Sequence, residues 1–134
     1  MKIEDVEGIG PAYAAKLTAA GVTGTDALLE QGAKPSGRSR LAAESGIDAG
    51  LILEGVNHAD LMRINGIGSE YSDLLEAAGV DSPAELAQRN ATNLANTFQE
   101  VIAALPGDVR RIPSETVVQG WIDQARSLPR VVEH

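Results

Sequence analysis

Apolar residues recur along most of this chain at spacings of three and four, the period of an amphipathic helix. The clearest stripes are Tyr13, Leu17 and Ala20; Tyr71, Leu75 and Ala78; Leu94, Phe98, Ile102 and Leu105; and Val117, Val118, Trp121, Ile122, Ala125 and Leu128. Proline, glycine and small polar residues stand between the stripes, where helices begin and end. The pattern predicts an all-α fold in which the stripes face the core.

Capping residues set the expected helix boundaries. Pro11 suits the first position of a helix, and Gly21 suits the left-handed residue that follows one. The expected N-terminal caps are Thr23 or Thr25, Asp48 and Ser82, and the last helix is expected to begin near Pro113 or Ser114. We therefore expect helices over residues 11–20, 25–29, 38–45, 49–56, 69–78, 91–105 and 114–128, with a short one from 83. Asn57-His58-Ala59-Asp60 is expected to start a further arm, with Asp60 as its cap. Pro106-Gly107-Asp108 is expected to end the long helix.

The sequence also contains an internal repeat. Gly8-Ile9-Gly10 recurs as Gly66-Ile67-Gly68, 58 residues later, each time with a Tyr three residues past the second glycine. The run Ala19-Ala20-Gly21-Val22 recurs as Ala77-Ala78-Gly79-Val80. We expect one domain over residues 1–134, made of repeat one (about 3–57), repeat two (about 58–128) and a frayed tail (129–134). The two copies are expected to pack with pseudo-two-fold symmetry.

The composition narrows the class of protein. Aromatic residues make up only 3% of the chain, and there is no cysteine for a disulfide, a thiolate nucleophile or a Cys-ligated zinc. No apolar run approaches the roughly 18 residues of a membrane span. The first residues lack the apolar segment of a signal peptide, so we expect a cytoplasmic protein.

The charge balance argues against a generic nucleic-acid binder, which usually carries a basic patch. The formal net charge is −8, and no segment of the chain is basic. Residues 63–88 carry one Arg and five acids, whereas residues 89–134 carry five of each. The acidic excess is therefore greatest around the second Gly-Ile-Gly run.

Each Gly-Ile-Gly run, with the helix that follows it, resembles the helix-hairpin-helix motif of DNA-handling proteins. In that motif, backbone N–H groups at a helix N-terminus hold a phosphate. The resemblance makes these residues candidates for phosphate binding: Gly8, Ile9, Gly10, Lys16, Arg63, Gly66, Ile67 and Gly68. It also implies that the turns can hold a monovalent cation through backbone carbonyls, as in some relatives of the motif.

The side chains around the turns favour a structural role. DNA-binding members of the motif class carry Lys or Arg two residues past the second glycine, where this chain has Ala12 and Glu70. Glu70 would repel a phosphate. The alternative is that both turns let two helices meet closely and bury Ile9 and Ile67.

A second resemblance covers nearly the whole chain. The run from Asn57 to Gly79, together with Glu85-Leu86-Ala87-Gln88-Arg89-Asn90 and Trp121-Ile122-Asp123-Gln124-Ala125, is similar to a family of prokaryotic tandem helix-hairpin-helix proteins. That family is catalogued as a domain of unknown function. The resemblance implies a fold and leaves the activity open.

Other candidate chemistry is sparse. A secondary basic spot could form from Arg38, Arg40, Arg110 and Arg111, although surface arginines more often pair with nearby acids. Glu70, Asp73 and Glu76 could face a metal, but a solvated acidic face is the commoner explanation, and the sequence predicts no metal or cofactor site. His58 and His134 are the only histidines, and no catalytic motif surrounds them. We therefore expect no enzymatic activity.

Two functions remain open from the sequence. The first is a protein-interaction adaptor with an acidic surface and a partner that is itself basic. The second is weak, sequence-independent binding of a DNA or RNA backbone, chiefly through the first turn. Electrostatics favours the adaptor, because the net charge is −8 and neither turn carries the usual base.

Overall fold

The computed structural model describes residues 1–6, 9–104 and 112–134, and in these ranges the fold is all-α as expected. Its elements are η1 (Ile3–Asp5), α1 (Pro11–Ala19), α2 (Thr25–Gly32), α3 (Pro35–Ser45), α4 (Ala49–Leu61), α5 (Ser69–Ala77), α6 (Pro83–Leu86), α7 (Ala91–Ala104) and α8 (Glu115–Ser127). Within the described ranges, extended pairing is limited to an isolated bridge between Lys2 and Gly24. None of the described helices is long and apolar enough to cross a membrane.

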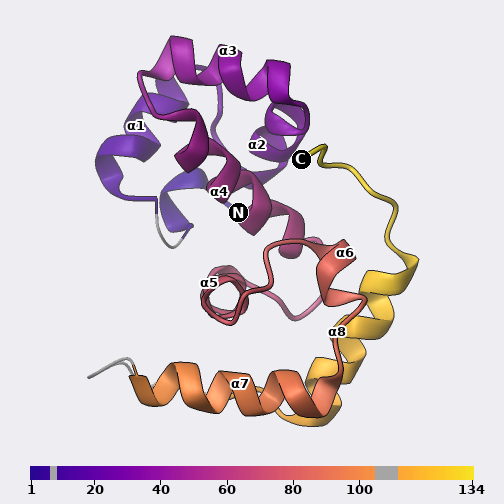
Figure 1. Cartoon of the computed structure of the whole chain (residues 1–134). Helices are drawn as coiled ribbons and strands as arrows, with labels where there is room; N and C mark the ends of the chain where they lie inside the picture. Colours follow the sequence, from indigo (N-terminus) through magenta and orange to yellow (C-terminus); the bar gives the residue numbers. More distant parts are fainter. Residues whose placement is uncertain (7–8, 105–111) are drawn as a thin grey trace.

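The helices form two lobes joined by α4 (Figure 1). The N-terminal lobe contains η1, α1, α2, α3 and the first turns of α4, and the C-terminal lobe contains α5 to α8. The core of the N-terminal lobe is Ile3, Ala14, Leu17, Val22, Leu28, Leu41, Ile47, Ile52, Val56 and Val132. The core of the C-terminal lobe includes Leu61, Ile64, Ile67, Leu74, Leu75, Val80, Leu86, Leu94, Phe98, Val118, Trp121 and Ile122. Each lobe therefore buries its own apolar stripes.

Two predicted caps, Asp48 and Ser82, are present, and Ser114 caps the last helix in the same way. The side chains of Asp48, Ser82 and Ser114 accept hydrogen bonds from the backbone N–H groups of Gly50, Glu85 and Val117. The cap predicted at Thr23 or Thr25 is wrong, since α2 begins at Thr25 itself and its N-cap is Gly24, without a side-chain bond. Glycine suits that position because a Cβ atom on residue 24 would lie 3.1 Å from Met1 O.

The turns that follow α1 and α5 are closely alike. Gly21 and Gly79 have φ values of 92° and 89°, the left-handed conformation that glycine adopts without a steric penalty. The next residue closes the turn in each case, with the Val22 N–H donating to Leu17 O and the Val80 N–H donating to Leu75 O, both at 2.8 Å. The left-handed residue predicted at Gly21 is confirmed.

The prediction that a separate arm starts at Asn57–Asp60 is wrong, because these residues belong to α4. The helix runs without interruption from Ala49 to Leu61, so Asp60 lies in its last turn and is not an N-terminal cap. Between Val56 and Leu61 there is no glycine or proline to end it. Asp60 is instead buried and pairs with Arg63, its Oδ1 lying 2.8 Å from Nη1.

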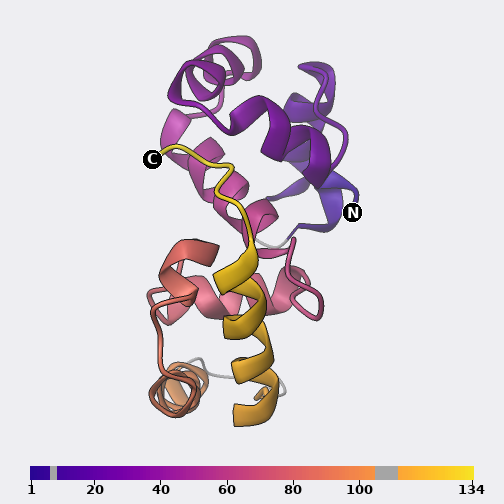
Figure 2. The ribbon, with the colours of Figure 1, turned by 90° about the vertical axis from the view of Figure 1, so that its right-hand side faces the viewer.

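The C-terminal tail is ordered, so the prediction of a frayed segment over residues 129–134 is wrong. The tail leaves α8 and returns to the N-terminal lobe beside α4 (Figures 1 and 2). Val132 is 1% exposed in that lobe's core, and the Glu133 N–H donates to Ala33 O at 2.7 Å. The buried Val132 side chain and the Glu133 backbone hydrogen bond hold the tail against the N-terminal lobe.

Two predictions of inward-facing residues are also wrong. Tyr13 and Val117 are 40% and 45% exposed. The prediction that Trp121 belongs to the core is confirmed, since it is 2% exposed and its ring lies 5.2 Å from that of Tyr71. Leu105 and the expected stop at Pro106-Gly107-Asp108 lie outside the described residues.

Candidate binding groove between the lobes

Polar side chains are buried where α4 passes from one lobe to the other. Asn57, His58 and Asp60 are 8%, 3% and 4% exposed, although they stand between the apolar residues Val56 and Leu61. Each has a partner, as buried polar groups require. The His134 ring donates from Nε2 to Asn57 Oδ1 at 2.9 Å, which joins the end of the chain to this crossing.

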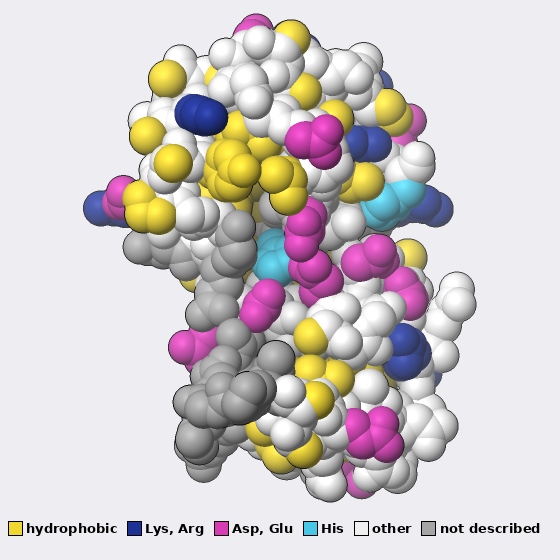
Figure 3. Space-filling view, turned by 60° about the vertical axis from the view of Figure 1, so that its left-hand side comes forward, with side chains coloured by type: hydrophobic (Ala, Val, Ile, Leu, Met, Phe, Trp, Pro, Cys, Tyr) yellow, Lys and Arg dark blue, Asp and Glu magenta, His cyan; other side chains and the backbone are white. Residues whose placement is uncertain are grey.

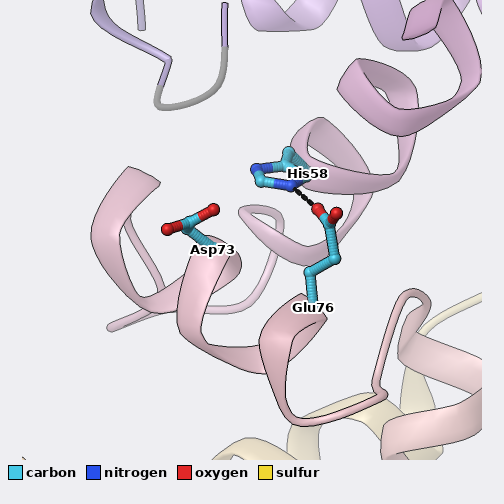
Figure 4. Close-up of side chains that lie close together, drawn as sticks. All are labelled: His58, Asp73 and Glu76. Carbon is cyan, nitrogen blue, oxygen red and sulfur yellow. Dashed lines mark hydrogen bonds and ion pairs between the residues drawn. The ribbon is translucent and has the colours of Figure 1, made fainter. Parts of the chain in front are cut away.

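His58 contacts Glu76 of α5 (Figure 4) and also Ser72 of the same helix. Its Nε2 meets the carboxylate of Glu76, and its Nδ1 lies 3.3 Å from Ser72 Oγ. The Ser72 hydroxyl donates to Ser69 O at 2.8 Å. The contacts of His58 therefore link the two lobes through polar groups at a point where the apolar cores do not meet.

Acidic residues surround this contact. Glu54, Glu76 and Asp81 line a groove with a cavity volume of about 180 Å³, together with Gly50, Leu53, Asn57, His58 and Leu61. We call it the waist groove. Figure 3 shows acidic side chains gathered between the two lobes, next to a histidine. The groove thus presents a concentrated negative charge at the narrowest part of the molecule.

The acids of the waist groove perturb one another. A hydrogen bond between the Glu54 and Glu76 carboxyl groups raises the pKa of Glu54, and partial burial and the charge of Glu76 raise it further. Two carboxylates this close cannot both ionise without a cost. The groove is therefore a place where added positive charge is favourable.

A second, mostly apolar pocket opens next to the groove and shares Glu54 and His58 with it. Its cavity volume is about 50 Å³, too small for a drug-sized ligand. Tyr13 and Leu51 line it and remain 40% and 43% exposed. Exposed apolar side chains beside an acidic groove offer contact area to an amphipathic partner.

The second Gly-Ile-Gly turn joins α4 to α5. Gly66 has a φ of 95°, Ile67 is buried at 4% exposure, and Gly68 is the exposed N-cap of α5. Arg63 donates to Pro129 O as well as to Asp60. The turn therefore buries its isoleucine, and its nearest arginine is already engaged within the protein.

Helix α8 covers the same turn. The amide of Gln124 accepts from the Asn65 N–H at 3.0 Å and donates to Asn65 O at 3.3 Å. A Cβ atom placed on Gly66 would lie 3.1 Å from Trp121 Nε1, which explains the need for glycine there beyond its backbone angle. These contacts leave the Asn65 N–H committed to the protein.

The first turn is described only in part, since Gly8 lies outside the described residues. Ile9 is half-buried, and Gly10 is the exposed N-cap of α1, which has no acidic residue in its first turn. Lys16 is exposed, with its Nζ 5.7 Å from the centre of the Tyr13 ring. The phosphate-binding candidates Gly10 and Lys16 therefore lie on the same helix, at its opposite ends.

The prediction of a secondary basic spot is wrong at Arg38, one of its two described residues. Arg38 is only 6% exposed, because its guanidinium donates to three carbonyl oxygens, those of Gly32, Ala33 and Glu133. Arg40 is exposed and pairs with Glu44 at 3.2 Å. Arg110 and Arg111 lie outside the described residues. Arg38 is thus a structural residue that fastens the tail to the N-terminal lobe.

Of the acids that line the waist groove, the sequence pointed to Glu76 but not to Glu54 or Asp81. The prediction treated His58 as part of a helix start, which separated it from Glu54. In one continuous helix the two are four residues apart and lie on the same face. The missed signal was the lack of any helix-breaking residue between Val56 and Leu61.

Comparison with protein families assigns the chain to one family. A family described as a domain of unknown function (DUF4332) matches residues 7–128, and the chain belongs to that family. Comparisons with curated proteins and with solved structures find no match. The family assignment names no activity, so function must be argued from the groove and the turns.

Proposed function

We propose that this protein is a non-enzymatic adaptor built from two helix-hairpin-helix repeats, and that its waist groove binds a basic segment of a partner protein. The observation that carries the proposal is the cluster of Glu54, Glu76 and Asp81 in one groove beside exposed Tyr13 and Leu51. Complementary charge speeds encounter and selects the partner, while the apolar rim supplies burial.

The repeat interpretation is supported by the order of the elements and by their turns. Helices α1 and α5 both follow a glycine N-cap, and both end in the same glycine turn. Each is followed by a short helix, α2 or α6, and then by two longer ones. Helix α4 then ends the first repeat and also supplies the first arm of the second hairpin.

The proposal can be tested by affinity purification from cell extract with the whole chain as bait. The groove variant is Glu54→Lys with Asp81→Lys, and the matched control is Glu30→Lys with Glu100→Lys, exposed acids outside the groove. A protein partner retained by wild type and control but lost from the groove variant is expected. With the purified partner, we expect at least about a tenfold loss of affinity, roughly 1.4 kcal/mol.

Equal loss from both variants would mean that bulk charge, and not the groove, attracts the partner. Partners retained equally by the wild type, the groove variant and the control would contradict the proposal. Because the interaction is electrostatic, added salt should weaken binding to the wild type and to the control. A partner whose contact region is acidic or purely apolar would also count against a basic segment as the ligand.

The second candidate is weak binding of a nucleic-acid backbone through the first turn. What favours it is that Gly10 caps α1 without a side-chain bond, that no acid lies in the first turn of α1, and that Lys16 is exposed. Fluorescence anisotropy with labelled DNA tests it, using Lys16→Glu against Lys34→Glu as control. About three phosphate contacts would give a log–log salt slope near −2.7. Unchanged DNA anisotropy at low salt would rule out this candidate function.

A further inference from the structure

Three side chains capable of binding a metal converge at the waist from two helices. A ligand atom of His58 on α4 and carboxylate oxygens of Asp73 and Glu76 on α5 all lie within 4.8 Å of one another (Figure 4). Asp73 and Glu76 are three residues apart, so they share a face of α5. The cluster combines a buried imidazole with carboxylates and is not just an acidic surface.

A hydrogen-bond chain behind His58 determines which ring nitrogen carries a proton. The single hydroxyl proton of Ser72 is used in the 2.8 Å bond to Ser69 O. The 3.3 Å contact between Ser72 Oγ and His58 Nδ1 therefore requires Nδ1–H to donate to the hydroxyl oxygen. A hydrogen bond of this kind on one nitrogen leaves the other with its lone pair available for a metal.

The available lone pair points at another acceptor. His58 Nε2 meets a carboxylate oxygen of Glu76, which is also an acceptor when ionised. The imidazole side chain is only 4% exposed, so water does little to separate the two groups. A cation between Nε2 and the carboxylate satisfies both, and that cation is either a proton or a metal ion.

We propose that His58, Asp73 and Glu76 form a binding site for a divalent transition-metal ion of the Zn²⁺ type. Imidazole with carboxylates suits such ions, whereas Mg²⁺ and Ca²⁺ favour oxygen ligands alone. Around a tetrahedral Zn²⁺ the ligand atoms are about 3.3 Å apart. The three ligand atoms already lie within 4.8 Å of one another, so small side-chain movements suffice, in which Glu76 moves away from His58 Nε2 to admit the ion. Glu54, next to Glu76, offers a further carboxylate.

The ion would change the molecule in two ways. It would bind α4 to α5 across the waist, where the two lobes meet through polar contacts. It would also add two positive charges beside the acids of the waist groove. The proposal does not depend on a protein partner, because the three ligands belong to this chain.

The test is calorimetric titration of the metal-free full chain with ZnCl₂. We expect saturable binding of one Zn²⁺ per chain and a melting temperature that rises with zinc concentration. His58→Gln and Asp73→Asn should each weaken binding by at least about tenfold, because changes outside the ligand set already cost 10–100-fold in metal sites. MgCl₂ at the same concentrations should give no saturable binding.

The matched control is His134→Gln, since His134 is the only other histidine and pairs with Asn57. That variant should bind Zn²⁺ as the wild type does. Asp73→Asn keeps the test valid if the buried His58→Gln variant fails to fold, which circular dichroism would reveal. Absence of saturable binding would leave a proton as the cation and overturn the proposal. Unchanged affinity in Asp73→Asn, or equal loss in His134→Gln, would also overturn it.

Discussion

The two lobes follow similar backbone turns but fill their cores differently. In the described residues the N-terminal core is aliphatic, whereas the C-terminal core is built around Phe98 and Trp121, with Tyr71 packed against them. The N-terminal lobe also takes Val132 from the far end of the chain. Large aromatic rings bury more area per side chain than aliphatic ones, so the C-terminal core is richer in apolar area.

This difference shows that the same turn geometry can be stabilised by different means. The C-terminal lobe uses its own helices, with Gln124 of α8 binding Asn65 in the turn. The N-terminal lobe is completed by the tail, held through Val132 and through Arg38 on the Glu133 carbonyl. We therefore expect the lobes to respond separately to core mutations but jointly to loss of the waist contacts.

The largest effect is expected for Phe98→Ala in the C-terminal core. Phe98 is fully buried, and such truncations cost about 3–5 kcal/mol of unfolding free energy. Hydrogen exchange followed by mass spectrometry should show faster exchange in α7 and α8, with α2 and α3 less affected. Equal acceleration in both lobes would mean that the two cores unfold as one unit, contrary to the comparison.

Val132→Ala in the tail is expected to destabilise the other lobe, the N-terminal one. Removing two buried carbons should cost about 2 kcal/mol, because each contributes transfer free energy and leaves part of a cavity. Exchange should accelerate in α2 and α3 while α7 and α8 keep their protection. The matched control is Val131→Ala, since Val131 is 37% exposed. Similar destabilisation by both variants would show that the tail does not complete the N-terminal core through Val132.

Much of the local structure could be predicted from the sequence, but not which segments far apart in the chain meet. Periodicity and caps predicted the helices, as at Asp48 and Ser82, because these signals act within one turn of the chain. The tail could not be predicted, because Val132 is buried only by contacts with the other end of the molecule. Burial of Arg38 depends likewise on three carbonyls that only the fold brings together.

At the waist groove, a wrong boundary for α4 hid part of the site, and the contacts with α5 could not be predicted at all. Glu54 and His58 belong to one helix, but their partners on α5 come from a later segment. A correct boundary for α4 would have placed Glu54 and His58 on one face. It would not have indicated that Asp73 and Glu76 lie opposite, because that depends on the angle at which α5 leaves the Gly66 turn.

A smaller effect, about 1–2 kcal/mol, is expected for Gly66→Ala in that turn. Alanine is strained at a φ of 95°, and its Cβ would lie 3.1 Å from Trp121 Nε1. The control is Gly68→Ala, where φ is −96° and no heavy atom lies within 4 Å of the added carbon. Chemical denaturation should separate the two variants. Equal stability of both would mean that the turn relaxes freely and that α8 does not restrict it.

The smallest effect is expected for Gln124→Ala, which removes the side chain that holds Asn65. Both hydrogen bonds are solvent-exposed, so water can replace them and the cost should be no more than about 1 kcal/mol. The informative measurement is therefore local: amide exchange of the turn over residues 64–68 should accelerate while the core of α8 stays protected. Gln119→Ala is the control, since its amide donates to Asp123 on the same helix. If exchange in the turn is unchanged, the bonds from Gln124 do not stabilise the hairpin. The proposed difference between the two lobes would then lose its support from α8.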